Sequence, residues 1–395
     1  MKKLFLSLMT ANFSGMLISV VIFLINTYRL ELSEYFLYSY INSALIIAGS
    51  FVLFGTDNLA LVSYDTHSSS LIYRSVKRIK RRMLILGVLI FFGSCIYFGF
   101  TNSAYAPSLI TICCAFSIPF LLSFYNADTH YYIHKEVYNK YIRLTIYARL
   151  ICLIPIMIAA FFQQYLLLTT LLANSMATIL PPIIFNRKNR PVEEARREEK
   201  VTVFPAVRLF ENFILNSFPV LYINAVFFLF NAVNAVFVKS SIVVYTSRIY
   251  IILAGILSGV VSVLISSHLK KTMRFIERFG RYLWLIPVIL LAAPLVLKFA
   301  ISIDYEFKFI LWSSLELASI TCFLVLFFIK IYQGERNPKL VLQLFLITAL
   351  FFVYTKLTTF SLEDLMLKRG LFNCVLVLIV FPFSGIKKKS ADAIQ

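Results

Sequence analysis

Charged residues are scarce in this chain, and their scarcity excludes a water-soluble domain. Only 14% of the 395 residues are charged, 60% are hydrophobic, and the mean hydropathy is +0.82. Ordinary soluble chains carry roughly 25% charged residues. A soluble domain of this length could not bury the apolar surface that this composition provides. The composition therefore predicts an all-α polytopic membrane protein.

The chain also lacks the motifs of common enzymes and metal sites. It contains no glycine-rich phosphate loop, Walker signature or GxSxG elbow. Its six cysteines form no CxxC pair and lie within apolar stretches, which indicates small packing residues. His130 and His134 are four residues apart without the glutamate of a zincin motif. We therefore expect no catalytic residues, no metal and no cofactor.

Long uncharged stretches are what the chain has instead. A membrane-spanning helix needs roughly 20 apolar residues, and residues 4–28 carry no charge. This run exceeds the apolar region of a signal peptide, so it predicts a first span. The eleven further expected spans lie at 35–63, 83–100, 107–127, 141–162, 165–185, 204–229, 233–266, 282–297, 307–329, 339–355 and 370–386.

The position of the fifth span follows from length. The uncharged run Leu150–Asn186 has 37 residues, which is short for two spans and a turn at Gln163-Gln164. The fifth span must therefore begin before this run. Arg149 is then drawn into the membrane.

The distribution of Lys and Arg predicts the orientation. Of the 38 basic residues, 27 fall in segments assigned to the inside and 6 in segments assigned to the outside. Cytoplasmic loops of membrane proteins hold the excess of basic residues. We therefore expect a protein of the bacterial inner membrane with both termini on the cytoplasmic side. The net charge of +19 is spread over every inner loop, which favours contact with anionic phospholipids over nucleic-acid binding.

A basic central loop divides the expected spans into two sets of six. Because six is even, both halves begin and end in the cytoplasm and would be parallel repeats. We expect an N-terminal six-helix bundle at 1–185, a basic linker at 186–203, a second bundle at 204–386 and a basic tail at 387–395.

Three cations stand at membrane depth, where an ionisable side chain costs several kcal/mol and usually faces a cavity or a partner. Arg248 lies near the middle of the eighth span, too deep for easy snorkelling to the interface. Arg149 lies about two turns into the fifth span, where snorkelling and a cavity role both stay open. Lys239 lies near the outer end of the eighth span and is also compatible with an interfacial position.

Three acidic residues are candidates for ion coupling. Glu211 is three residues from Arg208, so an ion pair within the helix is the competing interpretation. Asp57 lies near the inner end of the second span, where an interfacial role is also open. Glu316 has apolar neighbours and is either a proton site or the partner of a distant cation.

Arg29 directly follows the first expected span, Glu34-Tyr35 stands at the start of the second, and residues 244–249 read VYTSRI. These two segments resemble polysaccharide flippases of the multidrug/oligosaccharidyl-lipid/polysaccharide exporter superfamily. In that family an arginine ends the first span, an acidic-aromatic pair and a tyrosine open the second, and Phe-Gly lies near its inner end. The glycines usual in the turn are replaced here by Glu31 and Phe36. Residues 244–249, VYTSRI, resemble the start of the family's eighth span. The matching residues of the first segment are Arg29, Leu30, Glu34, Tyr35, Tyr38, Phe54 and Gly55.

The resemblance implies an O-antigen-type flippase that moves undecaprenyl-pyrophosphate-linked oligosaccharide to the periplasmic leaflet by alternating access. A pyrophosphate needs cations in a water-filled lumen, and Arg29, Arg149, Lys239 and Arg248 are the candidates. The energy would come from a gradient of H⁺ or Na⁺. A polymerase and a chain-length protein would be partners.

Two other functions compete with the flippase. An O-antigen polymerase needs a sizeable periplasmic loop, and the largest outside loop expected here is Lys356–Arg369, with Glu363 and Asp364. A multidrug exporter of the same superfamily would share the two sets of six spans, but it usually has an acidic cavity. With Arg208 counted beside Arg149, Lys239 and Arg248, at least four cations stand against three acids, and this excess favours an anionic substrate.

Overall fold

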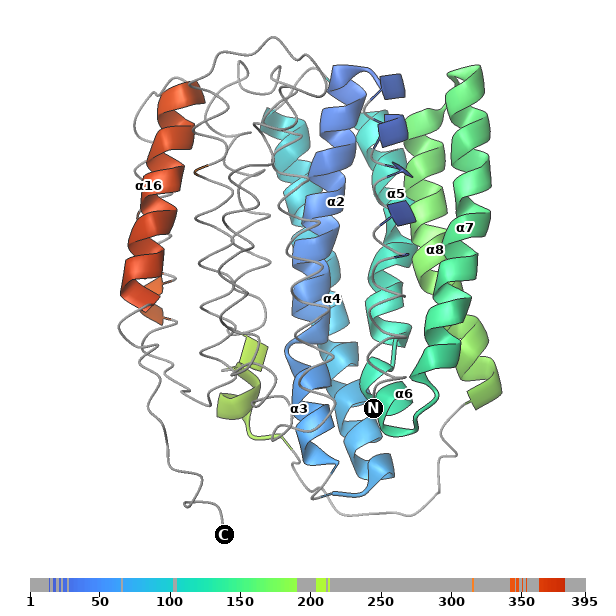
Figure 1. Ribbon diagram of the computed structural model, residues 1–395, viewed down its shortest axis with the longest axis vertical. Helices are drawn as coiled ribbons and strands as arrows, with labels where there is room; N and C mark the ends of the chain where they lie inside the picture. Colours follow the sequence, from blue (N-terminus) through green and yellow to red (C-terminus); the bar gives the residue numbers. More distant parts are fainter. Residues whose placement is uncertain are drawn as a thin grey trace. The chain divides into compact units, whose positions relative to one another are not determined.

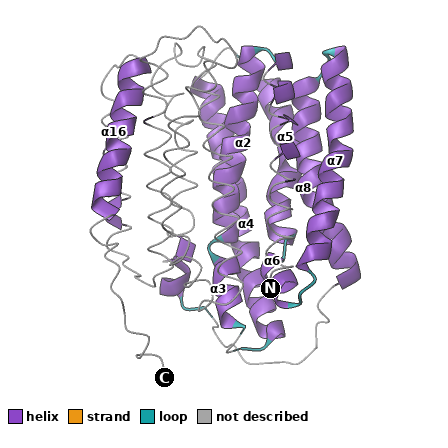
Figure 2. Ribbon diagram, in the orientation of Figure 1, coloured by secondary structure: helices purple, strands orange, loops and turns teal. Residues whose placement is uncertain are grey.

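The structure is a computed structural model in which every described element is a helix (Figure 2). It describes residues 28–64, 67–101, 105–189, 204–210, 212–213 and 362–380, with isolated positions within 14–26, at 315 and within 342–353. The chain divides into two compact units, Met1–Ser266 and Ser267–Gln395.

Seven helices of the first unit have both ends among the described residues (Figure 1). The five long helices alternate in direction, and the short helices α3 and α6 lie at the same end of the bundle. We call this end the inner end. The helices are α2 (Leu32–Leu53), α3 (Thr56–Ser63), α4 (Ser69–Thr101), α5 (Pro107–Asn126), α6 (Thr129–His134), α7 (Tyr138–Phe162) and α8 (Leu166–Asn189).

Five of these helices, α2, α4, α5, α7 and α8, are long and apolar enough to cross a membrane. They lie at the second to sixth predicted spans, so the described residues confirm a polytopic α-helical protein. The total of twelve spans, the two bundles and their boundaries stay predictions, because most of the chain after Asn189 lies outside the described residues.

The prediction of one continuous helix over 35–63 is wrong. α2 ends at Leu53, Phe54 and Gly55 have positive φ values of 44° and 66°, and α3 starts at Thr56. Two successive left-handed residues cannot continue a right-handed helix, and only glycine adopts this conformation without steric cost. The helix breaks at the Phe-Gly pair on which the family resemblance rests.

The predicted loop at 64–82 is also wrong over most of its length. α4 begins at Ser69, so the basic residues from Arg74 to Arg82 stand on its first turns rather than on a loop. Lys and Arg are good helix formers, and a charge count detects orientation but not secondary structure.

In the second unit, α16 (Leu362–Val380) likewise begins within the predicted outer loop Lys356–Arg369. Its first turn includes the acidic pair Glu363 and Asp364. The apolar part of this helix, Gly370–Ile379, is shorter than a full span.

The length argument for the fifth span is confirmed. α7 begins at Tyr138 and runs through Arg149. It ends at Phe162, and the next residue, Gln163, has a φ of 54° at the turn into α8. The structure therefore confirms the predicted turn at Gln163-Gln164.

A large apolar core joins α2, α4, α5, α7 and α8 of the first unit. α2 contributes more buried residues to this core than any other helix, and its Leu37, Tyr40 and Ile41 are almost fully buried. At Gly87 a Cβ would lie 2.6 Å from Val52 Cγ2, so α4 approaches α2 where a side chain is missing. The prediction that cysteines pack as small apolar residues is confirmed for the buried Cys95, Cys113 and Cys114.

Candidate functional site

The predicted site residues of the first half do not gather at one place. Arg149 is half-buried in α7, Arg29 is exposed just before α2, and Asp57 lies in the first turn of α3 at the inner end. The remaining four candidates lie outside the described residues. They are Lys239, Arg248, Glu211 and Glu316.

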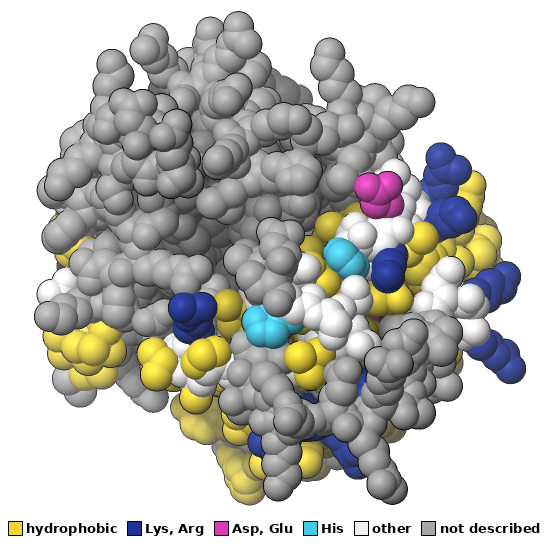
Figure 3. All heavy atoms as spheres, turned by 90° about the horizontal axis from the view of Figure 1, so that it is seen from below, with side chains coloured by type: hydrophobic (Ala, Val, Ile, Leu, Met, Phe, Trp, Pro, Cys, Tyr) yellow, Lys and Arg dark blue, Asp and Glu magenta, His cyan; other side chains and the backbone are white. Residues whose placement is uncertain are grey.

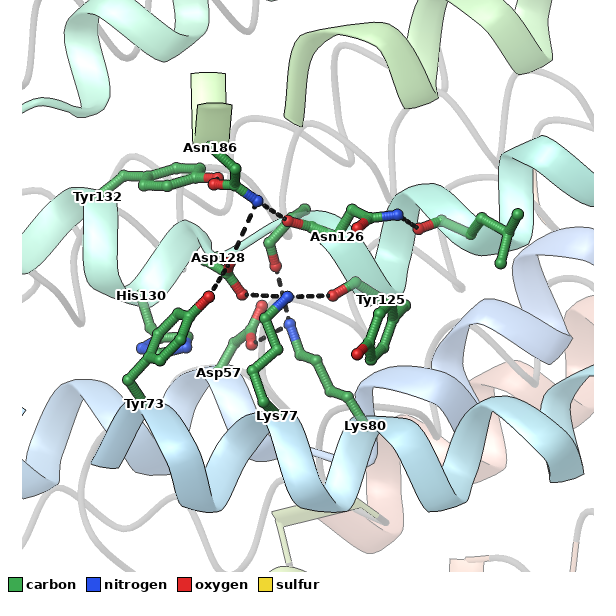
Figure 4. A network of polar contacts seen from close by, with 12 residues as sticks. Asp57, Tyr73, Lys77, Lys80, Tyr125, Asn126, Asp128, His130, Tyr132 and Asn186 are labelled. Atoms are coloured by element: carbon green, nitrogen blue, oxygen red, sulfur yellow. Dashed lines mark hydrogen bonds and ion pairs between the residues drawn. The ribbon is translucent and has the colours of Figure 1, made fainter. Parts of the chain in front are cut away.

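Two lysines of α4 form the centre of a polar network at the inner end (Figure 4). The ammonium group of Lys80, which is 0% exposed, lies 2.8 Å from the carboxylate of Asp57 and donates to the carbonyl oxygen of Ala127 at 2.9 Å. One turn earlier, Lys77 lies 2.9 Å from Asp128 and donates to the carbonyl of Tyr125 at 2.8 Å. The two ion pairs join α3 and the segment after α5 to α4.

Asp128 extends the network to α8. Its Oδ2 accepts hydrogen bonds from the Tyr73 hydroxyl at 3.1 Å and from Asn186 Nδ2 at 3.3 Å. Asn186 also donates to the carbonyl oxygen of Asn126 at 2.8 Å and accepts from the Tyr132 hydroxyl. A residue at the end of α8 is thereby held to the α5–α6 segment by three hydrogen bonds.

The network balances its charges, of which Lys80 and Asp128 are buried and Lys77 and Asp57 half-buried. Lys77 and Lys80 carry two positive charges, and Asp57 and Asp128 carry two negative charges. Burial raises the pKa of Asp128, whereas the two lysines oppose that shift. A buried charge that loses its partner is very unfavourable, so the four residues depend on one another.

A buried histidine, His130, also lies at the inner end. It is 0% exposed, and its Nδ1 shares a hydrogen bond of 2.8 Å with the hydroxyl of Tyr64. The ring of Tyr64 stacks on His134 at 3.9 Å between centroids. Burial lowers the pKa of His130 to about 3, with Lys80, Lys77 and His134 acting in the same direction and Asp57 against it. His130 is therefore neutral in the folded protein at physiological pH.

The protein should lose stability when the pH falls below about 6.5, the ordinary pKa of histidine. In that range the unfolded chain binds a proton at His130 and the folded protein does not, which favours unfolding by about 1 kcal/mol per pH unit. Thermal unfolding at pH 7.5 and 5.5 measures the loss. His130→Gln should weaken this dependence, while the matched variant of the exposed His134, His134→Gln, should retain it. An unchanged dependence in His130→Gln would contradict the assignment.

Of the residues in this network, the sequence singled out only Asp57 as a candidate, and Lys77 and Lys80 entered only the orientation count. One signal was present: Tyr73, Lys77 and Lys80 are spaced four and three apart, so they share one helix face. It could be used only if 69–82 were recognised as helix. The contact of Asp128 with Tyr73 and Lys77 on this helix face depends on tertiary packing and could not be predicted from the spacing.

A second set of polar side chains, all uncharged, forms hydrogen bonds inside the bundle. Thr170 of α8 donates to Asn26 of the first predicted span at 3.2 Å, and Asn174 donates to the hydroxyl of Tyr38 at 3.1 Å. Tyr38 belongs to the motif that resembles the flippases. These bonds link α8 to α2 and to the first span through groups that can hydrogen-bond but carry no charge.

Comparisons with known proteins agree on fold. No protein-family profile matches the chain, and no curated protein matches it in sequence. Solved structures match over 97% of the chain. One is a MOP superfamily transporter from Pyrococcus furiosus Vc1 (DSM3638), 12% identical, with a TM-score of 0.59 over 95% of that chain. The chain has the fold of the MOP superfamily transporters.

Two further structures support the same fold. A MATE in complex with MaL6 is 13% identical, with a TM-score of 0.58 and 95% of that chain covered. A multidrug resistance MATE family transporter of the MOP superfamily, in an outward-facing conformation, is 13% identical, with a TM-score of 0.51 and 94% covered. The likeness agrees with the superfamily of the sequence resemblance. It does not distinguish the flippases within that superfamily.

Proposed function

We propose that this protein is a membrane transporter working by alternating access, and that its cargo is an anionic, lipid-linked oligosaccharide. The transporter part is carried by one observation, the likeness of 97% of the chain to solved MOP superfamily transporters. Transport through a helical bundle needs no covalent chemistry, which agrees with the lack of enzyme motifs in the sequence.

The cargo is proposed from charge. Arg149 stands half-buried in α7 within a candidate span, and the sequence places Lys239 and Arg248 at membrane depth in the second half. Cations in such positions suit a pyrophosphate group. The structurally similar transporter from Pyrococcus furiosus has a binding pocket of reverse polarity that suggests a different function for that protein. A pocket of changed polarity in this fold supports an anionic cargo.

An undecaprenyl-pyrophosphate-linked O-antigen unit, moved outward across a bacterial inner membrane, is the cargo that the sequence resemblance implies. Transport would be driven by H⁺ or Na⁺ and would feed a polymerase and a chain-length protein. Because Asp57 is paired with Lys80 at 2.8 Å, Glu211 and Glu316 are the preferred coupling residues. Arg29, exposed before α2, would meet the pyrophosphate only at the outer end.

A deletion strain tested for surface polysaccharide checks the proposal. We expect deletion to abolish long-chain polysaccharide, and the Arg248→Ala and Arg149→Ala variants to lower it about tenfold or more, because each removes a cation from the transport path. Arg81→Ala, an exposed cation of α4, is the control for loss of charge and should have little effect. Normal polysaccharide in the deletion strain would refute the flippase function.

The competing functions give different phenotypes. The neighbour named as a multidrug resistance transporter favours a drug exporter as the second candidate. Deletion would then raise sensitivity to cationic drugs and leave polysaccharide unchanged. A polymerase defect would instead leave single capped repeats at the cell surface without long polymer.

A further inference from the structure

The hairpin formed by α7 and α8 presents an exposed apolar face. On α7 the large side chains between Tyr147 and Phe162 that face outward are 45% to 79% exposed, and on α8 Leu180, Ile183 and Ile184 are 40% to 45% exposed. In a membrane these faces contact acyl chains. The α7 set is Tyr147, Leu150, Ile151, Ile154, Met157, Ile158, Phe161 and Phe162.

Each apolar face ends in two exposed cations at the inner end. α7 carries Lys140 and Arg143 in its first turns, and α8 carries Arg187 and Lys188 in its last turn. The two helices are antiparallel neighbours, so all four residues lie at the same end of the hairpin. None of the four belongs to either ion pair of the described residues. Seen from the inner end, Lys and Arg side chains project at the rim of the described surface (Figure 3).

The depth of these cations matches lipid headgroups. From Arg143 to Phe161 the helix rises about 27 Å at 1.5 Å per residue, close to the roughly 30 Å of a bilayer's hydrocarbon core. At the outer end of the hairpin Phe161, Phe162 and Tyr165 are 65% to 79% exposed, as expected for aromatic residues at the opposite interface. Arg143 and its neighbours therefore stand at the level of the inner-leaflet phosphates.

We propose that the inner ends of α7 and α8 together bind the headgroup of an anionic phospholipid. Two helices supply two cations each, and a guanidinium group can hold a phosphate with two parallel hydrogen bonds. The exposed apolar side chains directly above accept the acyl chains of the same lipid. Charge complementarity and the continuous apolar face identify the occupant as a lipid rather than a soluble anion.

α4 offers a matched comparison. Its Arg81 and Arg82 are also exposed and precede the exposed apolar residues Ile85 and Leu89. Both arginines come from a single helix, whereas the cations of the hairpin come from the two neighbouring helices α7 and α8. Removing them takes away the same charge at the same end of the bundle without disturbing α7 or α8.

Native mass spectrometry of the purified full chain in neutral detergent, titrated with phosphatidylglycerol or phosphatidylcholine, tests the site. At about 1 kcal/mol for each basic residue, Arg143→Gln/Arg187→Gln should bind phosphatidylglycerol about thirty-fold more weakly. Arg81→Gln/Arg82→Gln should stay within about threefold of the unaltered protein, and phosphatidylcholine should show no difference among the three. Unfolding temperatures confirm that both variants are folded, because all four side chains are exposed.

Two results would overturn the proposal. Full phosphatidylglycerol binding by Arg143→Gln/Arg187→Gln would show that the hairpin does not hold the lipid. An equal loss in the α7–α8 and α4 variants would show that overall surface charge, and no particular site, attracts the anionic lipid. Neither result bears on the proposed transport function, because none of these residues is placed in the transport path.

Discussion

Replacing Lys80 with methionine is expected to lower the free energy of unfolding by about 3 to 5 kcal/mol. Lys80 is 0% exposed, and its ammonium group is paired with Asp57 and bonded to the carbonyl of Ala127. Methionine fills similar space but leaves a carboxylate and a carbonyl oxygen without their donor. Thermal or denaturant unfolding of the purified protein in detergent measures the loss.

Two further variants separate loss of the ion pair from loss of packing. Arg81→Met alters the next residue of α4, which is exposed, and should change stability by less than about 0.5 kcal/mol. Adding Asp57→Asn to Lys80→Met should cost less than the sum of the single changes, because the uncompensated carboxylate is then gone. Strictly additive losses would show that the pair is not energetically coupled.

Gly55→Ala is expected to destabilise the protein by about 3 kcal/mol. Gly55 has a φ of 66°, where a Cβ costs roughly 1 to 2 kcal/mol, and that Cβ would lie 2.7 Å from the backbone nitrogen of Phe213. Backbone cannot move aside as a flexible side chain can. The same unfolding measurement, performed in parallel, reports the loss.

The matched control for this change is Gly93→Ala in α4. A Cβ there meets nothing within 4 Å, and the residue lies inside a helix. Alanine should be neutral or stabilise the protein by about 0.5 to 1 kcal/mol. If Gly55→Ala were as well tolerated as Gly93→Ala, the close approach of the α2–α3 break to Phe213 would be refuted.

The break at Gly55 also organises contacts that no local pattern predicts. The ring of Phe54 stacks on Phe213 at 4.6 Å, and Phe204 and Leu209 pack with Leu59 of α3. The start of the seventh predicted span therefore packs on the inner end of the second. Gly55→Ala should weaken this contact together with overall stability.

The sequence by itself determined that this is a membrane protein, the approximate positions of the second to sixth spans and the place of Arg149 within a candidate span. These features depend on local quantities, namely the length of an apolar run and the number of charges beside it, which a single segment expresses fully. For the same reason the loop at 64–82 was predicted wrongly, because hydropathy does not distinguish a basic helix from a basic loop.

Only the tertiary structure decided which polar residues meet. Lys80 counted in the sequence as one of many inner cations, yet it is fully buried because Asp57 of α3 and the carbonyl of Ala127 surround its ammonium group. Asp128 and His130 gain their positions in the same way, from a chain reversal that brings α6 beside α3 and α4. The free energy of a buried charge depends on partners that are distant in sequence, so no local pattern can reveal it.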